Sequence, residues 1–169
     1  MTGLDYDNDT IIEIACIITD GDLNTLEQGD DIIIHQPKEV MDSMNKWCIQ
    51  HHGESGLTQS VLESKVTMAE AEERILALVK RHCCTPRTAL LAGNSVHADR
   101  AFLRRLMPKL NEYLHYRIID VSSIGELGKR WNPSACLKRP KKKEAHRALD
   151  DILESIAELQ YYRMNLFKP

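Results

Sequence analysis

Hydrophobic and polar residues alternate along the chain in blocks that predict extended segments. Residues 11–19 are almost all apolar and rich in β-branched side chains, a pattern typical of a buried strand. Turn-forming residues at 20–22 and a second extended run at 31–35 together predict a hairpin. Short apolar runs at 89–92 and 116–121 indicate two later strands.

Apolar residues return at helical spacing in four segments: from residue 39 onward, at 67–81, at 99–106 and from about 148. Pro108 is expected to interrupt the third of these, because proline has no amide hydrogen to donate. Strands therefore come first and then alternate with helices. This order predicts an α/β fold with a mixed β-sheet flanked by helices.

Length and composition narrow the class of protein. The 169 residues, of which 43% are hydrophobic and 28% charged, fit a single domain spanning 1–169. No apolar run approaches the roughly 20 residues that cross a membrane. A net charge of -3 argues against bulk electrostatic binding of long nucleic acid, but leaves room for a short strand in a local pocket. Five cysteines without a C-x-x-C pair indicate a reducing compartment, and adjacent Cys83 and Cys84 are interpreted as inert.

The segment 146–151 is the first candidate for chemistry. Five residues turn a helix through about 500°, so His146 and Asp151 would point about 140° apart if both were helical. If His146 instead precedes the helix and Asp151 lies in its first turn, both can face one pocket as a general base and a metal ligand. The alternative of equal weight is that Asp150 caps the helix and His146 is a surface residue.

Other candidates are weaker when each is taken alone. Asp99 follows a strand, where carboxylates of α/β sheets can hold a cation, although a helix-starting Asp is more often a cap. The neighbouring His51 and His52 point in different directions and rarely bind one metal, so an anion contact fits one of them better. Arg117 is a candidate anion contact, with structural salt bridging as the stronger alternative. The basic run 138–143 is interpreted as a solvated loop in preference to a phosphate-attracting rim.

Taken in order, six segments resemble the oligoribonuclease family, 3′-to-5′ exoribonucleases of the DEDDh class. The segments are 1–5, 11–15, 51–57, 92–100, 115–122 and 146–151. Their order and spacing over nearly the whole chain make the resemblance specific. It implies an RNase H-like mixed β-sheet flanked by helices, and a substrate that is a dinucleotide or a very short oligoribonucleotide.

The resemblance also implies roles for individual residues. It implies a two-metal mechanism with Mg²⁺ or Mn²⁺, in which Asp99 and Asp151 match metal ligands and His146 matches the general base. Seven positions match substrate contacts of the family. Leu4 matches a residue that wedges between two bases, and Trp47 and His52 match residues that line the nucleotide pocket. Ser95, Arg117 and Ser122 match groups that cap the terminal 5′ phosphate, and Tyr116 matches a residue that is lent across a homodimer interface.

One departure from the family pattern concerns the start of the chain. Family members place an Asp-x-Glu pair, on the first strand of the sheet, just before the segment matching Met1 to Leu4. We therefore expect that first strand to be missing and the 169-residue chain to be nearly inactive, while a form extended upstream by that strand is active.

Three functions remain as hypotheses from the sequence. The first is an exoribonuclease of short RNA, and the second is a non-catalytic dimerisation or dinucleotide-binding relative. The third, a DNA-proofreading exonuclease, is disfavoured by the matches at Arg117 and Ser122. A cytoplasmic location is the default expectation, and a mitochondrial one would require an upstream leader.

Overall fold

Three short pairs of strands form the extended part of the molecule. A computed structural model describes residues 1–140 and 147–167. Its strands are β1 (Glu13–Ile14), β2 (Ile17–Thr19), β3 (Thr25–Gln28), β4 (Ile32–Ile33), β5 (Leu91–Gly93) and β6 (Ile118–Asp120). Strand β1 pairs antiparallel with β4, β2 antiparallel with β3, and β5 parallel with β6. The mixed α/β class is confirmed, but within the described residues the strands form three separate pairs where one sheet was expected.

The first apolar run is divided into two strands that pair with different partners. β1 and β2 are separated by Ala15 and Cys16. Ile12 and Ile34 extend the β1–β4 pairing through a 2.9 Å bond from the Ile34 amide to the Ile12 carbonyl, and both are fully buried. The predicted turn joins β2 to β3, where Asp20 accepts the amide hydrogens of two following residues. Strand β3 was not predicted because most of its side chains face solvent.

Helices make up most of the remaining chain. They are α1 (Lys38–Asp42), α2 (Lys46–Glu54), α3 (Leu57–Glu63), α4 (Met68–His82), α5 (His97–Leu106), α6 (Pro108–Tyr113), α7 (Val121–Trp131), α8 (Pro133–Cys136) and α9 (Ala148–Asn165). The four predicted helical segments are confirmed, with the first divided into α1 and α2 because Asn45 caps a new helix. Pro108 begins α6, a position where its missing amide hydrogen costs little. Helices α3, α6, α7 and α8 were not predicted.

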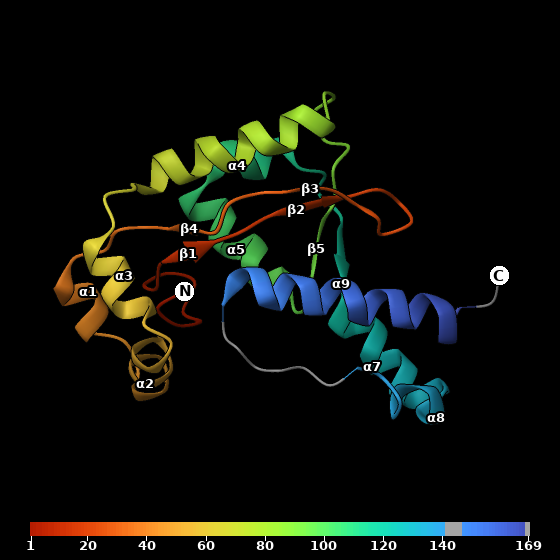
Figure 1. Ribbon diagram of the computed structural model, residues 1–169. Helices are drawn as coiled ribbons and strands as arrows, with labels where there is room; N and C mark the ends of the chain where they lie inside the picture. Colours follow the sequence, from red (N-terminus) through yellow and green to blue (C-terminus); the bar gives the residue numbers. More distant parts are fainter. Residues whose placement is uncertain (141–146, 168–169) are drawn as a thin grey trace.

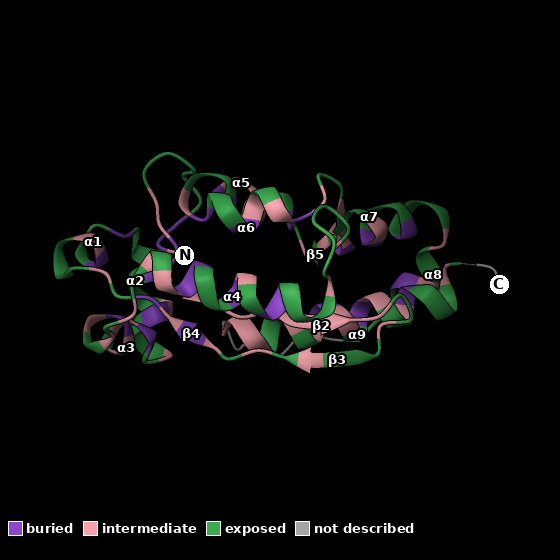
Figure 2. Cartoon of the chain, turned by 90° about the horizontal axis from the view of Figure 1, so that it is seen from above, coloured by how far each residue is buried: buried purple, intermediate pink, exposed green. Residues whose placement is uncertain are grey.

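The long helices lie on opposite sides of the strands. In Figure 1, α4 runs along one side of the strands and α9 along the other. In Figure 2, which shows the molecule from above, α4 lies between α6 and β3. The main core cluster packs α4, α5 and α6 against the strands, with Ile34 and Phe102 fully buried. A second cluster packs α1, α2 and α3 against Ile12, and a third joins α7, α8 and α9 around Tyr162. No helix in the described part of the chain is long and apolar enough to cross a membrane.

Candidate active site

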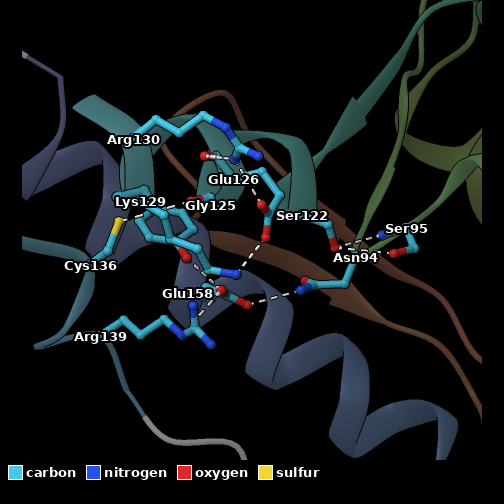
Figure 3. A network of polar contacts seen from close by, with 11 residues as sticks. Asn94, Ser95, Ser122, Gly125, Glu126, Lys129, Arg130, Cys136, Arg139 and Glu158 are labelled. Carbon is cyan, nitrogen blue, oxygen red and sulfur yellow. Dashed lines mark hydrogen bonds and ion pairs between the residues drawn. The ribbon is translucent and has the colours of Figure 1, made fainter. Parts of the chain in front are cut away.

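The carboxyl ends of the parallel strands β5 and β6 bring two predicted site residues together. Gly93 and Asp120 are register partners at these ends, so the loops that follow emerge side by side. The Ser95 amide donates to Ser122 Oγ at 3.0 Å, and the two hydroxyl oxygens lie 3.2 Å apart. Figure 3 shows the two serines facing each other. A serine pair therefore stands at the strand ends.

Asp120 holds this serine pair in place. Its Oδ1 accepts the amide hydrogens of Ser95, at 2.9 Å, and of Ser122, at 3.0 Å. The Nδ1 atom of His97 lies 3.9 Å from its other oxygen. No role was predicted for Asp120, because a local sequence pattern does not reveal a bond between residues 25 positions apart.

Asp99 lies close by, in the first turn of α5. Asp99 is an exposed residue, but the surrounding protein removes part of the water around its carboxyl group and raises its pKa. Its own backbone amide, the nearby Met1 amino group and His97 act in the opposite direction. Within the described residues, no other side chain donates a hydrogen bond to this carboxylate. A carboxylate that lacks a side-chain donor and is partly desolvated is suited to a cation.

Asp151 lies in the first turn of α9, which begins at Ala148. This placement fits the arrangement in which Asp151 and a preceding His146 can share one pocket, although His146 itself lies outside the described residues. The helix instead takes Arg147 as its N-cap residue, and Asp150 is an exposed residue inside the first turn. The alternative prediction that Asp150 caps the helix is therefore wrong.

The amino-terminal end of α9 is fastened to β1 by a buried carboxylate. Glu13 accepts hydrogen bonds from Arg147 Nε at 2.7 Å and from the Ala148 amide at 3.1 Å, and only 5% of its side chain is exposed. Burial raises the pKa of Glu13, and the bonds from Ala148 and Arg147 oppose that rise. Arg147 also pairs with Asp31 at 3.0 Å. The signal that could have revealed this role is a single charged residue inside an apolar strand.

A second bond network fastens the middle of α9 to the serine loop. Glu158 accepts from Asn94 Nδ2 at 2.9 Å and from the Tyr162 hydroxyl at 2.7 Å. Figure 3 shows Asn94, the residue before Ser95, reaching toward Glu158. Burial, followed by the bond to Glu158, raises the pKa of Tyr162 to about 12. The two networks fix α9 relative to both β1 and β5.

The residues expected to contact bases lie in the first loop and on α2. Leu4 and Trp47 are exposed by 71% and 52%, as expected of side chains that meet a ligand. His52 is buried, and its Nε2 lies 3.0 Å from the Met1 carbonyl oxygen. The Trp47 ring stacks on His51, with 4.0 Å between ring centroids. The contact of His52 with Met1 joins α2 to the loop that carries Leu4.

Tyr116 and Arg117 are not brought into contact with the serine pair. They precede β6, whereas Ser122 follows it, and a three-residue strand spans about 10 Å. The Arg117 guanidinium lies 5.4 Å from the Tyr116 ring centre, and Tyr116 is 73% exposed. Among the described residues Arg117 forms no ion pair, so the salt-bridge interpretation is not supported there.

The carboxylates present are compatible with an oxygen-liganded cation but do not complete a cage. Within 1–140 and 147–167, no three His, Cys, Asp or Glu side chains gather closely enough to hold a metal ion. Asp99 and Asp151 remain the predicted ligands, and carboxylate oxygens are what Mg²⁺ and Mn²⁺ prefer. The basic run at 138–143 lies mostly outside the described residues.

Comparison with known proteins places this site in a family. Residues 1–159 match the exonuclease family of the RNase T type. A mitochondrial oligoribonuclease of Mus musculus is 56% identical over 168 residues, covering 99% of this chain and 70% of the relative. A probable oligoribonuclease of Dictyostelium discoideum is 52% identical, with 99% and 87% coverage. An oligoribonuclease of Corynebacterium glutamicum is 49% identical over 167 residues, with 99% and 76% coverage.

The fold and the family match define an exonuclease. Identity of about half of all residues to oligoribonucleases, over nearly the whole chain, identifies the family more specifically. The chain belongs to the oligoribonuclease family. The resemblance inferred from the six sequence segments is thereby confirmed. Dependence on a divalent metal ion is a general property of this exonuclease family.

Proposed function

We propose that the protein is a 3′-to-5′ exoribonuclease that hydrolyses dinucleotides and very short oligoribonucleotides. Membership of the oligoribonuclease family supports the reaction and the substrate class, and the family match over 1–159 supports a single catalytic domain. The observation that best supports a short substrate is the serine pair at the ends of β5 and β6, near Asp99. A phosphate held by Ser95 and Ser122 would close the site a short distance from the reacting bond.

In the proposed reaction the protein groups have separate tasks. Asp99 and Asp151 would hold the divalent ions, for which we propose Mg²⁺ or Mn²⁺. When bound, such ions supply Lewis acidity and lower the pKa of a coordinated water. His146 would take the proton from the attacking water, a task suited to a side chain that titrates near neutrality.

The remaining predicted residues would bind the substrate. Leu4 and Trp47 present exposed apolar surface on which bases can stack, and buried His52 would fix the position of that surface. Arg117 would add positive charge, and its long side chain would have to extend along β6 to meet the phosphate. Together these contacts would hold two nucleotides.

The reaction is tested with a 5′-phosphorylated diribonucleotide and Mn²⁺, with the 169-residue chain and a form extended upstream by the Asp-x-Glu strand assayed side by side and mononucleotide release measured by chromatography. The extended form is expected to be the active one and carries the substitutions below. We expect turnover of the dinucleotide at least tenfold faster than that of a 20-mer. The substitutions His146→Ala and Asp151→Asn should each lower kcat by about 100-fold or more. Asp150→Asn is the matched control, because it removes the same charge from the same helical turn.

Each competing function predicts a different outcome of this assay. Binding of the dinucleotide without hydrolysis by any preparation would favour the non-catalytic dinucleotide-binding alternative. Equal turnover of a single-stranded DNA of the same length would favour the proofreading alternative. Loss of activity in Asp150→Asn equal to that in Asp151→Asn would contradict the assignment of Asp151 as the ligand.

We also propose that the protein is a homodimer. Leu127 and Trp131 lie one helical turn apart on α7 and are 45% and 76% exposed, and Leu137 beyond α8 is 86% exposed. Exposed apolar side chains of this size are typical of a surface covered by a partner. Light scattering should give twice the monomer mass, and Trp131→Glu should give the monomer. A wild-type protein that is monomeric at 50 μM would contradict this proposal.

For the location in the cell we propose the mitochondrion. The relatives from Mus musculus, Homo sapiens and Saccharomyces cerevisiae are named mitochondrial, which outweighs the cytoplasmic default. Fractionation of the source cells with an antibody to this chain tests the proposal. Recovery of the protein with cytosolic markers only would contradict it.

A further inference from the structure

Asp120 does more than cap the helix that follows it. As the N-cap of α7 it accepts the amide hydrogen of Ser122 at 3.0 Å, which is an ordinary capping bond. The same oxygen also accepts the amide of Ser95 at 2.9 Å, from the loop after the neighbouring strand. One carboxylate oxygen therefore ties the two serine loops to a single point.

Ser95 needs such a tie because of its backbone conformation. Its φ angle is +51°, in the left-handed region that residues other than glycine seldom adopt. A conformation of this kind persists only where the surroundings hold it. The bond from the Ser95 amide to Asp120, shared with Ser122 Oγ, provides that hold.

The bonds within the pair determine what Ser122 can offer to a ligand. Its hydroxyl oxygen accepts from the Ser95 amide at 3.0 Å and from the Ser95 hydroxyl at 3.2 Å. A hydroxyl group has two acceptor lone pairs and one donor hydrogen, so only the donor hydrogen of Ser122 remains. Ser122 therefore presents a donor to the site. A phosphate oxygen is a pure acceptor and matches it better than a terminal hydroxyl does.

The negative charge of Asp120 is turned away from such a ligand. Its Oδ1 is occupied by the two amides, and its Oδ2 accepts from the Ser123 hydroxyl at 2.9 Å. The imidazole of His97 lies 3.9 Å from Oδ2, and only 15% of the Asp120 side chain is exposed. Protein donors thus surround the carboxylate, and the outward-facing groups are the serine hydroxyls.

We infer that Asp120 is the positioning residue that orients Ser95 and Ser122, and that it thereby sets the preference for a 5′-phosphorylated over a 5′-hydroxyl end. This inference rests on the proposed function, in which the serine pair contacts the 5′ phosphate. Asp120 itself touches no substrate in this scheme. Substitution of Asp120 should therefore change the ratio of the affinities for the phosphorylated and the hydroxyl ligand, and should not weaken both affinities equally.

The test compares the affinities of 5′-phosphorylated and 5′-hydroxyl diadenylate, measured by calorimetry with EDTA present so that the ligand is not hydrolysed. We expect wild type to prefer the phosphorylated form by at least 30-fold. Asp120→Ala should reduce this preference at least tenfold, through loss of affinity for the phosphorylated ligand only. Asp120→Asn keeps the Oδ1 acceptor and should stay within about threefold of wild type.

Two further variants separate positioning from charge and from folding. Asp120→Glu keeps the charge but displaces the acceptor by one carbon–carbon bond, so its preference should fall as in Asp120→Ala. Asp120→Glu also replaces Asp120→Ala as the test variant if the alanine variant does not fold. Asp20→Ala is the matched control, because Asp20 likewise accepts amide hydrogens from residues two and four positions later, in the β2–β3 turn.

The outcomes distinguish failure of this inference from failure of the proposed function on which it rests. A wild-type protein that binds both ligands equally would overturn the phosphate role of the serine pair, and with it the inference. A wild-type preference that survives in both Asp120→Ala and Asp120→Glu would overturn the inference alone. Equal weakening of both ligands would show that Asp120 only stabilises the fold.

Discussion

Removal of the Glu13 carboxylate tests how the amino-terminal end of α9 is held. Glu13→Ala removes the bonds to Arg147 Nε and to the Ala148 amide, at 2.7 Å and 3.1 Å. Hydrogen bonds to charged groups contribute about 1.5–3 kcal/mol each, and breaking a buried ion pair costs about 3–5 kcal/mol. These figures set the upper range of the expected loss.

Two features of the structure reduce the expected value. Arg147 is 31% exposed and keeps its second partner, Asp31, so it is not left unpaired. The raised pKa of Glu13 shows that burial offsets part of what its bonds contribute. We therefore expect Glu13→Ala to lower the free energy of unfolding by about 2 kcal/mol, which for a protein of this size is about 4–8 °C in Tm.

Urea unfolding and hydrogen exchange together check this prediction. The loss should be accompanied by faster amide exchange in the peptide covering 147–155, because the first turn of α9 loses its remote cap. Glu27→Ala is the control, since the exposed pairs of Glu27 with Arg81 and His82 should contribute much less. Unchanged stability, or exchange that increases equally throughout the chain, would refute the reasoning.

Three other predictions follow from the pKa shifts. Burial raises the pKa of the Cys16 thiol to about 11, so iodoacetamide at pH 8 should modify exposed Cys84 well before Cys16, as read by peptide mass spectrometry. Arg81 and His82 hold the pKa of Glu27 at about 2. Its contribution to stability should be complete above pH 4.5, decline steadily as the pH falls below 4.5 and be gone at about pH 2, when wild type and Glu27→Gln are compared by thermal unfolding. The pKa of Tyr162 is about 12 against an ordinary 10, so above pH 10 wild type should lose stability relative to Tyr162→Phe, and equal pH profiles would contradict this.

The elements with a clear hydrophobic period could be predicted from the sequence. The stripe of α4 and that of α9 gave the correct type of element and nearly correct bounds, because each buries one face along its whole length. Helix α7 was missed although Val121, Ile124 and Leu127 follow helical spacing. Gly125 and Gly128 lie inside this helix and lower its helix propensity, which weakens the pattern.

The candidate site was predicted in part, for a physical reason. Asp99 was a candidate because it follows a strand, whereas Ser95 and Ser122 were assigned through the family resemblance. The groups that hold them act across the fold, as Glu13 does over 134 positions and Asp120 over 25. Such bonds depend on which loops the topology brings together. The hydrophobic pattern within each bonded segment does not show which other segment will lie beside it.

The anchoring of α9 by Glu13 has a consequence for synthesis on the ribosome. The bond joins residues 13 and 147, so the first strand must wait for nearly the whole chain to be made before this contact can close. Contacts between such distant positions form late, because the intervening chain must first be ordered. A nascent chain would therefore lack the contact that fixes the amino-terminal end of α9, and with it the position of Asp151, until that helix has been made and has docked.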